Sequence, residues 1–270
     1  KENYIHVCYF ESGFDQDTNS GLLPLTIQFF DTSVIVNSTI ASWRWDFNND
    51  DIIDSYQQNP EYVYDTLGIY TVKLIIIDSS GYISDTTIKE DLIEVNGIMA
   101  GFEAIPVFGY IPVSVNFSNT SISHNAEITG WEWDFQNDGI IDSLDENPIW
   151  TYTEAGYYSV KLIITGESTK ELVTDTITKE NFITANELIA EFHSDKDYGH
   201  FPLQVHFYDY SYGYPVNYEI NSRQWDFQND GIIDSHFQNP LWTYSEPGIY
   251  SVKLIAGNLN QLVYDTILKI

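Results

Sequence analysis

The chain has 270 residues, 40 of them acidic and 11 basic, which gives a formal net charge of −29. Such an acidic surface repels the phosphates of nucleic acids and of anionic membranes, so the composition excludes both as expected partners. The single cysteine, Cys8, excludes an internal disulfide framework and a cysteine-based zinc site, and we expect it to act as a small apolar residue near the first strand. No run of 18 apolar residues predicts a membrane span, and the chain, which starts at Lys1 without a signal-peptide core, is interpreted as a segment of a longer protein.

One motif occurs three times along the chain. It reads WDFNNDDIIDS at 45–55 and WDFQNDGIIDS at both 133–143 and 225–235. The three tryptophans that begin it are separated by 88 and 92 residues, a spacing typical of tandem domains. The sequence therefore predicts three domains, at 1–97, 98–187 and 188–270.

The expected elements follow the same order in each repeat. An entry segment carries a phenylalanine, and a strand that begins with proline follows it. The W-D-F strand comes next, then an Asn-Pro turn, then a strand of the pattern G-x-Y-x-V-K-L, and finally an exit strand such as 85–95 or 175–185. The entry phenylalanines are Phe10, Phe102 and Phe192, and the proline-led strands are 24–29, 112–117 and 202–207.

Apolar and polar residues alternate in these strands, which indicates half-buried antiparallel β-strands. Thr71 and Lys73 are expected to lie in solvent. The residues of the first repeat that are expected to face inward are Leu25, Ile27, Phe29, Tyr70, Val72 and Leu74.

No segment has convincing helical periodicity, so the fold class is predicted to be all-β. About seven short strands around a buried tryptophan describe an immunoglobulin-like sandwich, in which Tyr70, Tyr158 and Tyr250 could be tyrosine-corner residues. The junctions between repeats are short and contain no Pro-rich or Ser-rich run, so we expect stiff coupling in an elongated array. The third repeat stops at DTILKI, several residues short of where the first two finish, which is expected of a cut within a longer array.

The order W-D-F, an Asp-rich and Gly-rich turn, N-P, and then T-Y-x-x-x-G-x-Y-x-V-K-L resembles the PKD (polycystic kidney disease repeat) domain family. The resemblance covers all three repeats. It implies a β-sandwich of immunoglobulin type, as found in surface-layer and adhesin-like proteins and as an accessory module of secreted proteases and glycosidases. The family usually has a short G-D-G turn after W-D-F, and here the turn is longer.

The longer turn raises the possibility of a cation site. With the aspartate of W-D-F as position one, oxygen-bearing side chains fall at positions one, three, five and nine, and a backbone carbonyl falls at seven. This spacing resembles the first nine positions of an EF-hand loop and predicts a structural calcium site in each domain. The predicted ligands are Asp46, Asn48, Asp50 and Asp54, then Asp134, Gln136, Asp138 and Asp142, then Asp226, Gln228, Asp230 and Asp234.

The motif departs from an EF-hand in three ways. Position twelve is Gln57, Asp145 or Phe237 instead of glutamate, strands are expected on both sides in place of helices, and Asp51 replaces the glycine in the first copy. The alternative is a hairpin whose Asp and Asn side chains bond the turn's own backbone. The family resemblance favours this alternative for the aspartate of W-D-F, whereas several carboxylates close together call for a neutralising cation. Both interpretations stay open.

Aromatic side chains are a further candidate, for carbohydrate binding. Strand alternation places Trp43 on the same face as Trp45, which favours packing against the core. The other tryptophans considered are Trp131, Trp150 and Trp242. No catalytic motif is present, and the six histidines do not recur at equivalent positions, so we expect no enzymatic activity.

The sequence thus predicts a non-catalytic spacer or adhesive stalk of an extracellular or cell-surface protein, stiffened by structural calcium. Its expected partners are neighbouring repeats of the same longer chain and a cell-surface protein or polysaccharide. The alternative is an accessory region of a secreted hydrolase that helps to present a polysaccharide or protein substrate.

Overall fold

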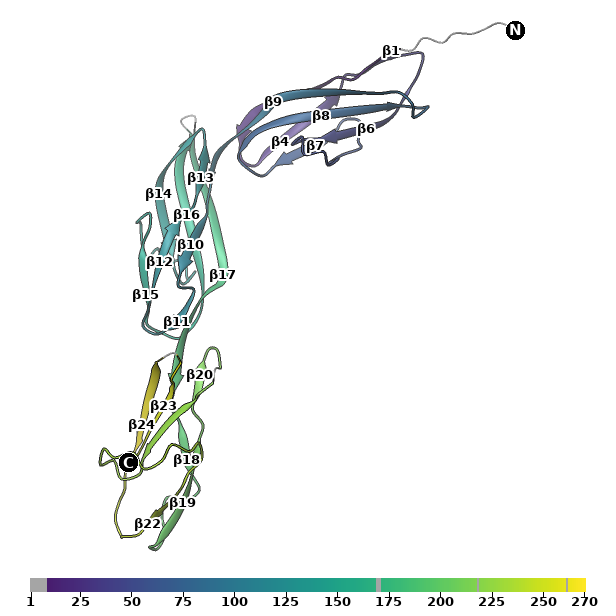
Figure 1. Ribbon diagram of the computed structural model, residues 1–270. Coiled ribbons are helices and arrows are strands. Elements are labelled where there is room, and N and C mark those ends of the chain that lie inside the picture. The colour runs from purple at the N-terminus through teal and green to yellow at the C-terminus, as the bar shows by residue number, and fades with distance from the viewer. Residues whose placement is uncertain (1–8, 169–170, 218, 261) are drawn as a thin grey trace.

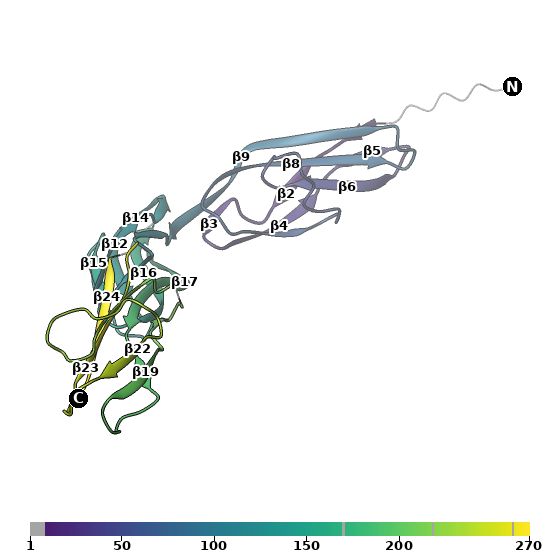
Figure 2. The same ribbon diagram turned by 60° about the horizontal axis from the view of Figure 1, so that its bottom comes forward.

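The computed structural model describes residues 9–168, 171–217, 219–260 and 262–270. Every regular element in this part of the chain is a β-strand, which confirms the predicted all-β class. None of its elements is a helix long and apolar enough to cross a membrane. Three β-sandwiches follow one another in an extended, bent array (Figures 1 and 2). Cys8 lies outside the described residues, so the expectation for its side chain stays a prediction.

The first sandwich is built from two sheets. One is antiparallel, with strands in the order β2 (Phe14–Gln16), β4 (Leu25–Asp31) and β7 (Glu61–Tyr64). The other joins β6 (Ile40–Asp46), β8 (Gly68–Asp78) and β9 (Ser84–Met99) antiparallel, and β3 (Ser20–Leu22) lies parallel to β9. A short pair formed by β1 (Tyr9–Glu11) and β5 (Val34–Val36) lies where the chain enters this domain.

The second sandwich repeats this topology. One sheet contains β10 (Phe102–Ile105), β12 (Val113–Asn119) and β15 (Ile149–Tyr152). The other contains β14 (Ala126–Asp134), β16 (Gly156–Ser168), β17 (Glu171–Ile189) and, parallel to β17, β11 (Phe108–Tyr110). Strand β13 (Ile122–His124) pairs with the end of β9.

The third sandwich has the same two sheets with fewer strands. One contains β18 (Phe192–Ser194), β19 (Leu203–Asp209) and β22 (Leu241–Tyr244), and the other contains β21 (Ser222–Asp226), β23 (Val252–Asn258) and β24 (Val263–Lys269). Strand β20 (Tyr212–Tyr214) pairs with the end of β17. The described part of this domain has no counterpart of β3 or β11.

Each core is centred on the tryptophan of W-D-F, and Trp45, Trp133 and Trp225 are completely buried. A buried phenylalanine meets each indole edge-on, with 5.2 Å between ring centroids. The three pairs are Phe14–Trp45, Phe102–Trp133 and Phe192–Trp225. The prediction of Phe10 as the first entry phenylalanine is therefore wrong. Phe10 is only half-buried and lies on β1, four residues before the phenylalanine that fills the core.

The predicted alternation is confirmed for the apolar residues. Leu25, Ile27, Phe29, Val72 and Leu74 are buried, and Tyr70 packs against them. The expectation that Lys73 lies in solvent is wrong, because only 7% of this residue is exposed. Its aliphatic stem lies against the sheet, and its ammonium group reaches a buried carboxylate, as described below.

Two sets of tyrosines tie the loops to the sheets. The hydroxyls of Tyr70, Tyr158 and Tyr250 donate to backbone carbonyls four residues upstream, at 2.9–3.0 Å, which confirms the predicted tyrosine corner. The hydroxyls of a second set, fully inside the domains, donate to the carbonyl of the W-D-F phenylalanine at 2.9–3.1 Å. These tyrosines are Tyr64, Tyr152 and Tyr244.

The last strand of one sandwich continues without a break into the next. Strand β9 pairs with β8 up to Val95, and its final residues, Gly97–Met99, pair with β13 of the second domain. Strand β17 does the same, since it pairs with β16 up to Ala185 and then with β20 of the third domain. Ile98 is accordingly buried in the core of the second domain and Leu188 in the core of the third.

Candidate functional site: the acidic loops and the domain junctions

The aspartate of each W-D-F is buried and holds the acidic loop closed. One carboxylate oxygen of Asp134 accepts the N–H of Asp138 at 3.1 Å, and the other accepts the N–H of Gly139 at 2.9 Å. The equivalent distances around Asp46 and Asp226 are also 3.1 and 2.9 Å. The loop is therefore wound around a carboxylate that belongs to the strand before it.

The carboxylates at positions nine and five also bond the loop backbone. Asp142 accepts the N–H of Phe135 at 2.8 Å, and Asp54 and Asp234 make the same contact in the other domains. Asp138 accepts the N–H of Ile140 at 2.9 Å. These contacts correspond to the hairpin alternative, in which side chains replace the missing ladder bonds of a turn.

Position twelve contributes its backbone. The indole N–H of Trp133 donates to the carbonyl oxygen of Asp145 at 2.9 Å, and the matching acceptors are Gln57 and Phe237. A backbone acceptor is indifferent to the side chain, which explains why three different residues occupy this position.

The tight loops need backbone conformations that most residues avoid. Asn137 and Gly139 have φ values of 53° and 89°, in the left-handed region that asparagine tolerates and glycine adopts freely. In the first domain, Asp51 occupies the glycine position at φ 68°. Its carboxylate lies 2.7 Å from the ammonium group of Lys73, a contact that the glycine of the other two loops cannot make.

A lysine from the next central strand neutralises each buried carboxylate. The Nζ–Oδ2 distances are 2.7 Å for Lys73–Asp46, 3.1 Å for Lys161–Asp134 and 2.9 Å for Lys253–Asp226. These lysines belong to the V-K-L blocks and were missed as functional residues. Their identical place in three repeats that also conserve W-D-F was the signal that could have revealed them.

The same contacts set the protonation of the buried carboxylates. Burial by itself raises the pKa of Asp46, Asp134 and Asp226, but the lysine ammonium and the loop N–H groups together outweigh burial. The pKa of each carboxyl therefore lies below its usual value, and all three are ionised at neutral pH.

The predicted calcium ligands are only partly brought together. In each domain, position one points into the sheet while the side chains at positions three and five are exposed. Within the described ranges, no group of three or more His, Cys, Asp or Glu side chains lies close enough to hold a metal ion in this arrangement. Calcium binding stays a prediction.

The tryptophans considered for carbohydrate binding are packed against the cores. Trp150 stacks on Phe135 and Trp242 on Phe227, with ring centroids 4.9 and 4.8 Å apart. Trp43 donates its indole N–H to Asp31 at 2.8 Å. All seven tryptophans lie in the described part of the chain. Trp45, Trp133 and Trp225 are buried, and the other four are partly buried against the cores.

The first junction is held by side chains as well as by strand pairing. The amide group of Asn125, which follows β13, donates to Glu94 and to Asn96 of β9, at 2.8 Å in each case. Asn125 has a φ of 47°, which lets the short turn after β13 bring this amide back to β9. These contacts join the exit strand of the first domain to the second domain.

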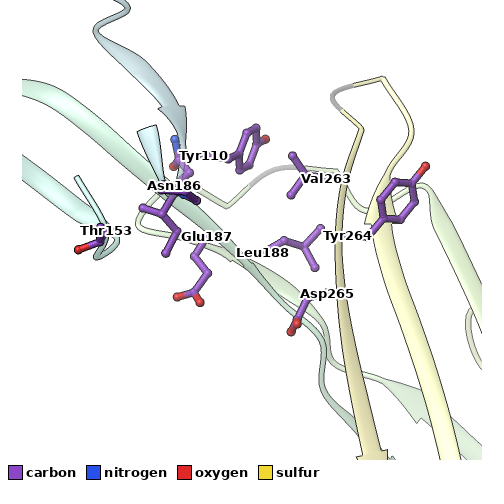
Figure 3. Close-up of a pocket in the computed structure, with 10 residues that line it drawn as sticks. Tyr110, Thr153, Asn186, Glu187, Leu188, Val263, Tyr264 and Asp265 are labelled. Atoms are coloured by element: carbon purple, nitrogen blue, oxygen red, sulfur yellow. The ribbon is translucent and has the colours of Figure 1, made fainter. Parts of the chain in front are cut away.

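The second junction carries a cleft of about 440 Å³ (Figure 3). Tyr110 and Asn186 line it from the second domain, and Val263 and Tyr264 line it from the third. The amide of Asn186 donates to the carbonyl of Gly109 at 3.2 Å, while its carbonyl oxygen is buried without a partner among the described residues. We assign this cleft no ligand.

These features define a tandem array of immunoglobulin-like β-sandwiches. A family model described as "PKD domain" matches residues 13–92 and 112–180, and the chain belongs to the PKD domain family. PKD domains are generally non-catalytic accessory modules and occur in secreted or surface proteins.

Solved structures similar to this chain include PKD1 domains of two Vibrio proteins. The domain from the Vibrio cholerae metalloprotease PrtV is 27% identical over 33% of this chain and 98% of its own, with a TM-score of 0.27. The domain from Vibrio anguillarum Epp is 27% identical over 33% and 96%, also with a TM-score of 0.27. Three N-terminal domains of the bacteriophage RB49 outer capsid protein Hoc are 11% identical over 92% and 91%, with a TM-score of 0.32.

Replacing Lys161 by methionine should destabilise the second domain. The change keeps the aliphatic stem but leaves the Asp134 carboxylate without its cation, and losing a hydrogen bond to a charged group costs about 2 kcal/mol. Hydrogen exchange of the domain's amides measures the loss. Lys196→Met is the control, at an exposed lysine that donates to the carbonyl of Gln204 at 2.7 Å and lies 3.9 Å from its nearest carboxylate, and it should change stability less because it leaves no buried charge unpaired. Equal effects of the two substitutions would contradict the role given to Lys161.

The stability of the array should fall in acid. An unfolded Asp has a pKa of about 4, and the three buried carboxyls have lower values when folded. Their contribution is therefore fully present above about pH 4 and is lost as the pH falls through the folded pKa values. Melting midpoints between pH 2 and 7 test this, in about 1 M salt so that general charge repulsion is screened. A midpoint that rises steadily below pH 4 would contradict the expectation.

Proposed function

We propose that this chain is a non-catalytic spacer and adhesion array of an extracellular or cell-surface protein. It would hold the regions at its two ends apart and present them to a cell-surface protein or a polysaccharide. The observation that carries this proposal is the pair of strands that pass from one domain into the next without a break, β9 and β17.

A strand that belongs to two sheets restricts the hinge between them. Bending at the first junction would break the pairing of Gly97–Met99 with β13 and would pull Ile98 out of the second core. It would also separate Asn125 from Glu94 and Asn96. A flexible linker has none of these contacts, so the two junctions support a rod-like spacer better than a chain of independent beads.

The net charge of −29 supports an exposed, solvated array, because it favours solubility and opposes non-specific self-association. Membership of the PKD family supports a role without catalysis.

Structural calcium is a second part of the proposal. In the second domain the loop contains Asp134, Asp138 and Asp142 against one lysine, and the first domain has four carboxylates against one. The excess negative charge and the alternating oxygen-bearing side chains support calcium recruitment by a rearranged loop. The ion pairs between the lysines and the buried aspartates already neutralise part of this charge, so the lysines compete with calcium for the carboxylates.

Breaking the shared strand should loosen the array. Insertion of Gly-Ser-Gly-Ser between Asn96 and Gly97 leaves the residues of both cores in place but separates the two halves of β9. The distribution of distances between spin labels at Ile52→Cys and Ile140→Cys, in a Cys8→Ser background, should at least double in width. Both labelling sites are 65% exposed.

The same insertion between Gly81 and Tyr82 is the matched control, because it lengthens an exposed turn away from the junction. This control should leave the distance distribution unchanged. If both insertions gave the original width, the shared strand would not be what stiffens the junction.

Calcium should raise the melting midpoint of the chain above its value in a chelator, because an ion that binds only the native state stabilises it. Melting in excess calcium, in excess magnesium and in chelator measures the effect. Magnesium is the control for general screening of the acidic surface, because it strongly prefers octahedral sites that keep several waters. Identical melting midpoints in calcium and in chelator would contradict a structural calcium site and would mean that the lysines alone neutralise the loop carboxylates.

A further inference from the structure

The second domain exposes apolar side chains along the edge where the chain crosses from β10 to β11. Ile105 is 73% exposed, Val107 42% and Phe108 45%. Two further exposed residues, Ile149 and Tyr157, lie on β15 and β16 of the same domain. Single exposed apolar residues are common on protein surfaces, whereas several on one edge mark an interaction site. We call these five residues the apolar patch.

Strand pairing arranges four of the five residues in two rows, one on each sheet. In each row, a polar residue of the middle strand pairs with an exposed apolar residue on either side, so the three side chains lie on one face. The rows are Ile105–Asn116–Ile149 and Phe108–Thr184–Tyr157. Neighbouring strands lie about 4.8 Å apart, so the two apolar members of a row are separated by about 10 Å. Residues 105–108 connect the rows, and the patch therefore wraps the edge of the sandwich.

The sandwich itself does not require apolar residues at these positions. Asp17, the counterpart of Ile105 in the first domain, accepts the backbone N–H of Gln28 at 3.1 Å. Asp195, the counterpart in the third domain, accepts the backbone N–H of His206 at 2.8 Å. At the positions of Ile105, Val107, Phe108 and Ile149, the first domain carries Asp17, Asn19, Ser20 and Glu61. Since the repeat folds with polar residues here, the apolar ones point to a role at the surface.

The place of β11 in its sheet adds to this argument. It is the last strand in the order β11-β17-β16-β14, and among the described strands it pairs with β17. Proteins usually protect such an edge with charged residues, because an unpaired edge invites another chain. The third domain carries Asp-Lys-Asp at 195–197, whereas the second carries Ile-Pro-Val at 105–107. The second domain thus leaves this edge without charges.

Exposed carboxylates border the patch. Glu103 and Glu154 are exposed and lie within three residues of it along the chain. Lys179 on the neighbouring β17 is already engaged, because its ammonium group donates to the carbonyl of Phe102 at 2.5 Å. An apolar centre with a charged margin is the arrangement of a protein interface with its core and rim.

We propose that the apolar patch docks a segment of a partner protein in which lysine or arginine residues lie between apolar ones. The apolar side chains would cover the two rows, and the basic groups would face the acidic margin. A second copy of this chain also carries −29 and is repelled. A polysaccharide is bound through polar groups that hold its hydroxyls, and Ile105, Val107 and Ile149 offer none. The inference rests on the proposed adhesive function and names the chemistry of its protein partner.

Hydrogen exchange of the full chain with three synthetic peptides of equal length tests the proposal. The peptides alternate lysine with leucine, lysine with serine, and glutamate with leucine. We expect only the lysine–leucine peptide to slow amide exchange at residues 107–110 and 157. Salt at about 0.15 M, with a Debye length of about 8 Å, weakens attraction by distant charges of the chain. Equal protection by the lysine–serine peptide would reveal general attraction of cations and would overturn the proposal.

Substitutions in the patch provide the second measurement. Ile105→Asp combined with Phe108→Ser introduces the residues that the first domain carries at these positions, so the variant should keep its fold. It should weaken binding of the lysine–leucine peptide by about tenfold or more, because two apolar anchors are lost. Ile140→Asp combined with Leu172→Ser is the matched control, since it makes the same changes of charge and polarity at residues 65% and 78% exposed. Equal affinities of the two variants would overturn the proposal.

Two further measurements identify a different occupant. Self-association of the full chain in sedimentation, lost in the patch variant, would assign the patch to a second copy. Protection of residues 107–110 by the neutral sugar cellohexaose, and by none of the peptides, would assign it to a polysaccharide. Either result would overturn the proposal. The spacer function has its own test in the spin-label distances across the first junction, so the two can fail separately.

Discussion

Each sandwich depends on an ionised carboxylate placed beside its central tryptophan. Such a charge is too costly to bury unless it is paired and hydrogen-bonded. Asp134 meets this requirement with two loop N–H groups and the ammonium of Lys161. The requirement fixes the path of the acidic loop and the register of two central strands, since Asp134 lies opposite Lys161 in the ladder. The same arrangement recurs in all three domains, which explains why this stretch varies least between the repeats.

A second constraint operates between the domains. The core of a sandwich is closed by the far half of its exit strand, and that strand goes on to provide the first buried residue of the next domain. Val95 and Ile98, three residues apart on β9, lie in different cores. Neighbouring domains therefore share one continuous strand at each junction, and this strand contributes buried residues to both cores.

Much of the fold could be read from the repeats. Period-two alternation identified the strands, and the fixed spacing of W-D-F, N-P and G-x-Y-x-V-K-L identified the sandwich and its tyrosine corner. The errors have a common cause. Alternation assigned Lys73 to solvent, and a search for a recurring phenylalanine selected Phe10 in place of Phe14. Both choices used local pattern alone, whereas the position of each residue is set by a partner elsewhere in the fold, Asp46 for the lysine and Trp45 for the phenylalanine.

The candidate site, like the fold, has features that follow from local sequence and features that depend on partners elsewhere in the fold. Spacing along the chain is a local property, so the motif alone predicts which side chains gather after W-D-F and that their oxygens alternate. The partners of those oxygens depend on the fold, since the lysine comes from a strand 27 residues further along the chain. The sequence likewise determined that the junctions are short. The strand pairing across the domain boundary, on which the proposed stiffness depends, is visible only in the fold, because a hydrogen-bonded ladder forms between segments that no local pattern relates.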